Sequence, residues 1–148
     1  MGVGSTAKAA GERIGVRHVE THPSYDADTD EYDMGLVFLS RPTTRNVTLP
    51  ALNRDPAFPA PGATSRAMGW GDTDEGDGQT VSEELLFVDL NVLSNEVCGK
   101  ARGGDVSYDT WIFDDMLCTY TQGRDACQGD SGAMRRRPVN MYTWVLVF

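Results

Sequence analysis

The sequence predicts an all-β fold, and two observations support that prediction. Short apolar runs are separated by clusters of Gly, Pro, Asn and Asp, the residues that dominate turns between strands. Leu86, Val88, Leu90 and Val92 alternate with other residues at a period of two, which is typical of a strand with one buried face. A chain of 148 residues is long enough for one domain with a hydrophobic core.

The candidate strands follow from these apolar runs in chain order. They cover residues 14–19, 34–39, 65–70, 86–92, 116–120 and 142–148. The second run is almost continuously apolar, so we expect that strand to be buried on both faces. Residues 50–62 contain four prolines and are predicted to form an extended connector. Ser94 has the hydroxyl of a helix N-cap, and a short helical turn is expected from it toward Lys100.

The charge balance restricts the classes of partner. Lys and Arg number 13 and Asp and Glu number 22, which gives a net charge of −9. An acidic chain without a basic stripe cannot neutralise phosphates, so neither a nucleic acid nor an anionic membrane surface is an expected partner. The one basic run, residues 135–137, is short and is expected to be a solvated loop. No apolar stretch approaches the roughly 20 residues of a membrane-spanning helix, and residues 1–16 contain no apolar segment typical of a signal peptide.

Residues 125–132, Asp-Ala-Cys-Gln-Gly-Asp-Ser-Gly, carry the strongest chemical signal. A serine hydroxyl becomes a nucleophile when a base takes its proton and nearby donors stabilise the oxyanion that forms. Gly129 lacks a Cβ, so the backbone N–H groups of Gly129 and Ser131 can both face a substrate carbonyl. The pattern therefore favours nucleophilic catalysis by Ser131.

This string resembles the nucleophile loop of trypsin-like (chymotrypsin-fold) serine proteases, which is D-S-C-Q-G-D-S-G-G. The chain departs from it only at Ala126 and Ala133. Residues 22–39 are similar to the family's H-P-x-Y…N-D-I-A-L-L-x-L segment, and residues 49–50, 68–71 and 92–98 match further family segments. The resemblance implies an incomplete trypsin-like double β-barrel. Residues 12–49 would end the first barrel, residues 50–63 would connect the barrels, and residues 64–148 would form most of the second.

The resemblance also implies a role for each matching residue. Ser131 corresponds to the catalytic nucleophile and Asp33 to the acid of the catalytic triad. Gly129 and Ser131 correspond to the oxyanion hole. Asp125 lies six residues before Ser131, at the position that lines the specificity pocket. An acid there implies substrates with Arg or Lys beside the scissile bond, because a buried carboxylate pairs with a cation. Asp130 corresponds to the acid that binds the new N-terminal amine after zymogen cleavage.

The cysteines number three, which is unusual for a secreted protein. The resemblance implies a disulfide between Cys98 and Cys118. The family partner of Cys127 would lie beyond Phe148, so Cys127 is expected to be a free thiol. The family is secreted, and its partners are protein or peptide substrates and protein protease inhibitors; neither a cofactor nor a metal is implied.

The catalytic histidine of the family has no counterpart in this sequence. The only histidines, His18 and His22, lie close before Asp33 and neither is followed by Cys as the family motif requires. Both are expected to be structural or solvated. The activation sequence R-I-V-G-G and the substrate-binding S-W-G segment are also missing. We therefore expect a fragment of a serine endopeptidase, or an incomplete gene model, that is inactive alone. The alternative is an inactive protease homologue that acts as a binding module.

Two weaker motifs remain. Asp26, Asp28 and Asp30 have the initial spacing of an EF-hand calcium loop, but Glu31 stands where that loop needs Gly and Val37 where it needs Glu. We interpret this segment, and the similar acidic residues 72–77, as solvated loops rather than metal sites. Residues 46–48, Asn-Val-Thr, match the N-glycosylation sequon and agree with a secretory route, although such short matches often arise by chance.

Overall fold

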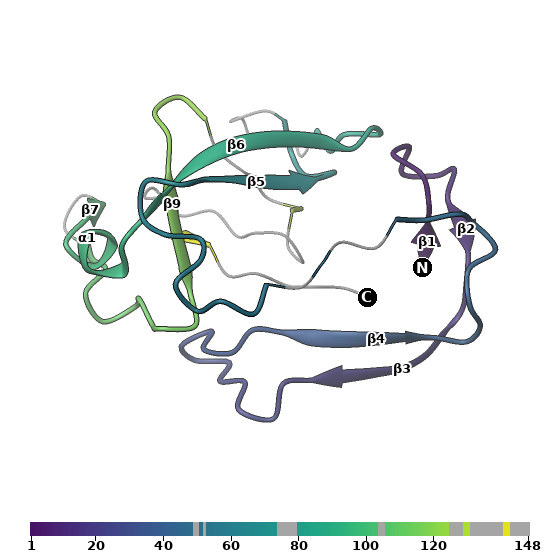
Figure 1. The fold of residues 1–148 in the computed structure, drawn as a ribbon, viewed down its shortest axis with the longest axis horizontal. Coiled ribbons are helices and arrows are strands. Elements are labelled where there is room, and N and C mark those ends of the chain that lie inside the picture. The colour runs from purple at the N-terminus through teal and green to yellow at the C-terminus, as the bar shows by residue number, and fades with distance from the viewer. Residues whose placement is uncertain are drawn as a thin grey trace.

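Strands dominate the structure, which is a computed structural model (Figure 1). It describes residues 1–48, 51, 53–73, 80–103, 106–124, 129–130 and 141–142. The elements in chain order are β1 (Gly2–Val3), β2 (Glu12–Arg13), β3 (Val16–Thr21), β4 (Gly35–Leu39), β5 (Thr64–Gly69), β6 (Leu86–Leu93), α1 (Asn95–Gly99), β7 (Arg102–Gly103), β8 (Val106–Ser107), β9 (Leu117–Tyr120) and β10 (Met141–Tyr142). Within the described ranges no helix is long and apolar enough to span a membrane.

The largest sheet has four antiparallel strands in the order β10-β9-β6-β5. Strand β6 is central, and its register sets Ala67 of β5 opposite Val88 and Ser65 opposite Leu90. Leu90 is only 1% exposed, and it forms the core cluster with Ala67 and the partly buried Val88. The alternation seen in the sequence therefore identifies the buried face of β6 correctly over its second half.

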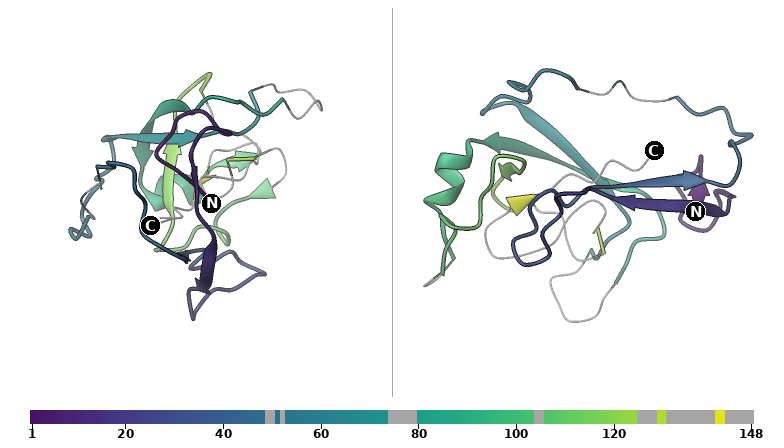
Figure 2. Two further views of the ribbon diagram at one scale, coloured as in Figure 1. Left: turned by 90° about the vertical axis from the view of Figure 1, so that its right-hand side faces the viewer. Right: turned by 90° about the horizontal axis from the view of Figure 1, so that it is seen from below.

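Strands β3 and β4 form a separate two-stranded antiparallel sheet. The hairpin lies across the molecule from β5 and β6, as Figures 1 and 2 show. Every residue of β3 is exposed, and in β4 Leu36 is 43% exposed. The expectation that this second apolar run is buried on both faces is therefore wrong. Burial of both faces needs a layer of structure on each side, and β3 is the only strand that pairs with β4 among the described residues.

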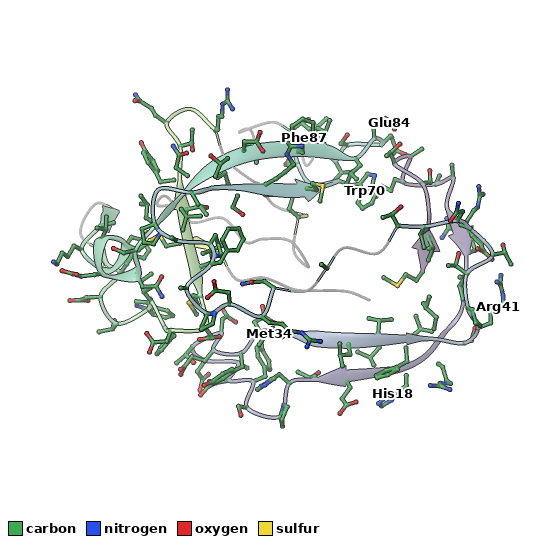
Figure 3. All side chains as sticks on the ribbon, in the orientation of Figure 1. His18, Met34, Arg41, Trp70, Glu84 and Phe87 are labelled. Atoms are coloured by element: carbon green, nitrogen blue, oxygen red, sulfur yellow. A yellow bond between two sulfur atoms is a disulfide. The ribbon has the colours of Figure 1, made fainter. Side chains whose placement is uncertain are left out.

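The N-terminal segment closes one end of the molecule. Strands β1 and β2 pair with each other, and the backbone N–H groups of Lys8 and Leu85 donate to the carbonyls of Glu83 and Thr6. The indole Nε1 of Trp70 donates to the same Thr6 carbonyl at 2.8 Å. Figure 3 shows Trp70 and Glu84 at the end of the β5–β6 ribbon that faces this segment.

Glu12 of β2 joins the N-terminal hairpin to the chain beyond β4. Its carboxylate accepts hydrogen bonds from the Thr43 hydroxyl and from Arg41 at 2.6 Å each, and from the Thr44 N–H at 2.9 Å. The bonds from Thr43, Arg41 and Thr44 stabilise the ionised form, and they lower the pKa of Glu12 to about 2. The segment after β4 is therefore tied to β2 at any physiological pH.

Helix α1 is a single turn that is fixed at both ends. The Ser94 hydroxyl accepts from the Val97 N–H at 3.2 Å, as expected of an N-cap. The side-chain amide of Asn95 donates to the carbonyls of Phe113 and Met116, which hold the loop before β9. A disulfide joins Cys98 of α1 to Cys118 of β9, with the Cα atoms 6.3 Å apart. The pairing implied by the family resemblance is confirmed.

The predicted strands agree with the structure to within a few residues. The first is displaced toward the C-terminus, because Ile14 is buried between β2 and β3 while the hairpin pairing starts at Val16. Residues 53–63 contain no helix or strand, as expected of a proline-rich connector. The predicted strand over 142–148 begins in β10, and residues 143–148 lie outside the described residues.

Candidate active site

Asp33 lies at the end of a tightly turned loop that joins β3 to β4. The Asp26 carboxylate accepts the N–H groups of Asp28 and Thr29 at 2.8 and 3.3 Å, which fixes the start of the turn. Asp30 and Tyr32 have φ values of 59° and 53°, in the left-handed region that non-glycine residues rarely adopt. The loop thus holds Asp33 in a defined position before β4, and the Asp26 carboxylate stabilises the turn itself.

Asp115 anchors this loop from a distant part of the chain. Its Oδ2 accepts the Tyr32 N–H at 2.6 Å, across 83 positions in the sequence. Asp115 belongs to the loop before β9, so the bond connects the β3–β4 hairpin with the four-stranded sheet. The sequence offers no signal for this contact, because it depends on the spatial meeting of two loops. A carboxylate that accepts the N–H directly before Asp33 restricts the position of Asp33.

The Asp33 carboxyl group is partly buried, and its pKa is raised above the ordinary value. Burial is the main cause, because it disfavours the charged form, and the negative charge of Asp30 adds to it. No hydrogen bond reaches this carboxylate from any residue that the structure describes. A cation or donor that approached Asp33 would lower its pKa again.

Neither histidine forms an ion pair or a hydrogen bond with Asp33 among the described residues. The His22 ring stacks on Tyr32 with centroids 4.9 Å apart, and its Nδ1 accepts the Ser24 N–H at 3.2 Å. His18 lies on the outer side of the hairpin (Figure 3), where it contacts Phe38 and lies 3.9 Å from Glu20. The ion pairs among the described residues include none between Asp33 and a histidine. These contacts support the structural role expected of both rings.

Asp130, directly before the predicted nucleophile, is seated on the end of β5. Its Oδ1 accepts the Gly71 N–H at 2.7 Å. A Cβ at Gly69 or at Gly71 would overlap the Asp130 carboxylate, so any other residue at either position would displace that carboxylate. Gly129 has a φ of 89° and lies against Gly71, where an added Cβ would be 3.4 Å from the Gly71 Cα. The glycines around Trp70 therefore form a seat for residues 129–130, a role that their sequence spacing alone did not reveal.

The predicted site residues divide into those that the structure describes and those that it does not. Gly129, Asp130 and Asp33 have defined positions, the first two at the β5 end and the third at the start of β4. Ser131, Asp125 and Cys127 lie outside the described residues. The amine of Met1 donates to the Ile14 carbonyl at 2.8 Å, so it is engaged within the N-terminal hairpin.

Comparison with known proteins shows which family this chain resembles. The trypsin family model matches residues 2–133. Trypsin epsilon of Drosophila erecta is 37% identical over 131 residues, which cover 88% of this chain and 50% of that protein. Trypsin alpha-3 of Lucilia cuprina is 32% identical over 124 residues, which cover 84% of this chain and 72% of that protein. The chain thus spans about half the length of Trypsin epsilon.

A solved structure agrees with the fold. Neuropsin, described as a serine protease expressed in the limbic system of mouse brain, superposes with a TM-score of 0.65 at 22% identity. The match covers 86% of this chain and 54% of that chain. The predicted all-β, trypsin-like fold is therefore confirmed. Because the family model covers most of the sequence, from residue 2 to residue 133, the chain belongs to the trypsin family of serine proteases.

Proposed function

We propose that this chain is part of a secreted serine endopeptidase that cleaves peptide bonds after Arg or Lys. Ser131 gives its proton to a general base and attacks the carbonyl carbon; the C–N bond then breaks, the amine leaves with that proton, and the acyl-enzyme that remains is hydrolysed by water. The N–H groups of Gly129 and Ser131 stabilise the oxyanion. Asp33 orients and stabilises the general base once that base is protonated. Asp125 binds the substrate cation in the specificity pocket, and Asp130 binds the N-terminal amine of the activated enzyme.

The seat of Asp130 is the observation that carries this proposal. Asp130 accepts the buried Gly71 N–H, and Gly69 and Gly71 leave no room for a side chain beside it. A carboxylate held so closely fixes residues 129–130, the backbone that precedes Ser131. Oxyanion stabilisation needs N–H donors that are already oriented before reaction, and a fixed backbone before the serine supports this requirement.

The general base must come from outside these 148 residues. His18 and His22 have contacts elsewhere, and the sequence contains no other histidine. In a serine protease of another fold, removal of the histidine alone lowers turnover by about 10⁶-fold. We therefore propose that the chain alone does not hydrolyse peptides, and that the active enzyme includes a segment with the histidine.

A chimera tests the proposal. The segments of Trypsin epsilon outside the aligned region would complete this chain, and cleavage would be profiled on a peptide library. Cleavage after Arg or Lys is expected, with Asp125→Ser weakening that preference and Ser131→Ala abolishing turnover while a basic inhibitor still binds. Preference for aromatic or small residues would overturn the assignment of Asp125. Activity in the Ser131→Ala chimera would overturn the assignment of the nucleophile.

A second candidate function follows from the histidine contacts, because both rings contact residues other than Asp33. In that alternative the protein is a protease homologue without turnover, and it binds basic peptides or protein protease inhibitors. Isothermal titration of the chimera and of the chain alone, with a basic peptide and with a trypsin inhibitor, separates the two. Binding without turnover in the chimera would favour the binding module, whereas turnover would show that residues 1–148 can serve catalysis once a histidine is supplied.

A further inference from the structure

The segment that follows β4 exposes an acceptor sequence that the proposed catalysis does not use. Asn46, Val47 and Thr48 form an Asn-x-Thr sequence outside any helix or strand. Asn46 and Thr48 are exposed, whereas Val47 between them is partly buried. No hydrogen bond engages the Asn46 side chain within the part of the chain that the structure describes. Its amide is therefore open to solvent and to an enzyme.

Contacts with Gly4 hold the backbone on either side of Asn46. A Cβ at Gly4 would lie 3.0 Å from the Arg45 Cβ and 3.5 Å from the Val47 Cγ1, so both side chains approach Gly4. Val47 is partly buried there, whereas Arg45, Asn46 and Thr48 are exposed.

The segment is also held in place immediately before the acceptor. The Glu12 carboxylate accepts the Thr43 hydroxyl and the Thr44 N–H, and the Thr43 hydroxyl accepts the Arg45 N–H at 3.0 Å. These bonds keep the chain against β2 up to Arg45. The backbone immediately before Asn46 is thus held in a defined position.

We propose that Asn46 carries an N-linked glycan. This inference rests on the secretory route included in the proposed function, because the modification takes place in that route. The donor is an oligosaccharide linked to a lipid diphosphate. The bond between the anomeric carbon and the diphosphate oxygen breaks, and the anomeric carbon bonds to Nδ2 of Asn46. One Nδ2 proton is lost to the catalytic base of the transferase, and the lipid diphosphate leaves with the bonding electron pair.

The position of Asn46 keeps such a glycan away from Asp33. Asp33 precedes β4 and Asn46 follows it, and a five-residue strand spans about 17 Å. Figure 3 shows Met34 at one end of β4 and Arg41 beyond the other. The glycan would therefore extend from the end of the hairpin opposite to Asp33.

Expression of the 148-residue chain behind a cleavable secretory leader in eukaryotic cells tests the site. We expect the wild-type chain to carry one glycan that a peptide N-glycosidase removes, with Asn46 converted to Asp in the peptide map. Asn46→Gln and Thr48→Ala should lose the modification, and Thr48→Ser should keep it. Val47→Pro should block it, because proline is not accepted at the middle position. Thr44→Ala, a neighbouring change outside the sequon, is the matched control and should remain modified.

Two results would overturn the proposal. One is unmodified Asn46 in wild-type chain recovered from the secretory compartment, and the other is an undiminished glycan in Thr48→Ala. The result does not depend on folding, because the modification is read from the mass of all the chain that enters the compartment. It is also separate from catalysis: an unmodified chain whose chimera cleaves after Arg would overturn this site and leave the protease proposal standing.

Discussion

Asp33 shows how a single carboxyl group makes stability depend on pH. Burial, and secondly the charge of Asp30, raise its pKa in the folded chain above the ordinary value of 3.8. The folded state therefore holds the proton more tightly than the unfolded state does. Its contribution to stability is fully present below the unfolded pKa, and it is lost as the pH rises through the raised folded pKa. At neutral pH the ionised Asp33 destabilises the fold.

We therefore expect Asp33→Asn to raise the free energy of unfolding at pH 7 and to lose this advantage as the pH falls below 4. The measurement is denaturant unfolding at several pH values of the chimera in its Ser131→Ala form, with the supplied histidine also replaced by Ala so that no base faces Asp33. Asp28→Asn, an exposed position in the same loop, is the control and should change stability little. An Asp33→Asn variant that is less stable at pH 7 would show that Asp33 is stabilised by a partner in the complete enzyme.

Gly69 tests the seat of Asp130. A Cβ there would overlap the Asp130 carboxylate, so Gly69→Ala should displace the carboxylate and leave the buried Gly71 N–H unsatisfied. An unsatisfied buried donor costs about 1–3 kcal/mol. We expect a loss of that size in the Ser131→Ala chimera, with faster hydrogen exchange at the Gly71 amide. Gly2→Ala, where a Cβ meets no atom within 4 Å, is the matched control.

A double-mutant cycle distinguishes this overlap from a general intolerance of alanine. In the Asp130→Ala background the carboxylate is absent, so Gly69→Ala should add little further loss. Equal losses in the two backgrounds would mean that Gly69 and Asp130 act independently, and the seat would then be rejected.

At the level of elements, the sequence predicted those parts whose signal is local. The period-two alternation identified β6, and the Ser94 hydroxyl identified the start of α1. The nucleophile motif indicated Asp130, but the seat at Gly69 and Gly71 depends on a contact across 59 positions. The Asp115 bond to the loop before Asp33 is equally non-local. The exposure of β4 could not be predicted, because an apolar run does not tell how many layers pack against it.

Strand β6 should contribute most through its second half. Leu90 is 1% exposed and belongs to the core cluster, whereas Leu86 at the start of the same strand is 47% exposed. Leu90→Ala should lower the free energy of unfolding of the inactive chimera by about 2–5 kcal/mol, the usual cost for a buried leucine. Leu86→Ala is the matched control and should cost far less. Similar losses at both positions would contradict the assignment of the core to this half of β6.

The disulfide joins α1 to β9 and closes a loop with a sequence separation of 20. Chain-entropy arguments give about 3 kcal/mol for a loop of this size. We expect Cys98→Ser with Cys118→Ser to lower the stability of the inactive chimera by that amount. In the 148-residue chain, mass mapping of alkylated thiols should find Cys127 free and the other two bridged. An intramolecular bridge to Cys127 would contradict the expected pairing.

At the scale of the whole molecule, many large apolar side chains are exposed and few are buried among the described residues. The buried hydrophobic residues that the structure describes are few: Ile14, Ala67, Leu90, Val92, Cys98, Tyr108, Met116 and Cys118. The β3–β4 hairpin pairs only within itself among the described strands, and Val19 is 57% exposed. An open sheet edge with exposed apolar side chains favours association with other chains.

We therefore expect the 148-residue chain alone to associate or to remain loosely folded, whereas the completed chimera should be a folded monomer. Burial of one Val or Leu side chain contributes about 1.5–3 kcal/mol, and a domain is stable by only about 5–15 kcal/mol. The exposed Val16, Val19 and Leu36 alone could therefore account for much of such a margin. Sedimentation and thermal unfolding of both proteins give the comparison. Val19→Thr with Leu36→Thr should reduce association of the isolated chain without producing a cooperative transition, because these changes remove apolar surface but supply no core. A monomeric isolated chain that unfolds cooperatively would show that the hairpin is stable without a covering layer.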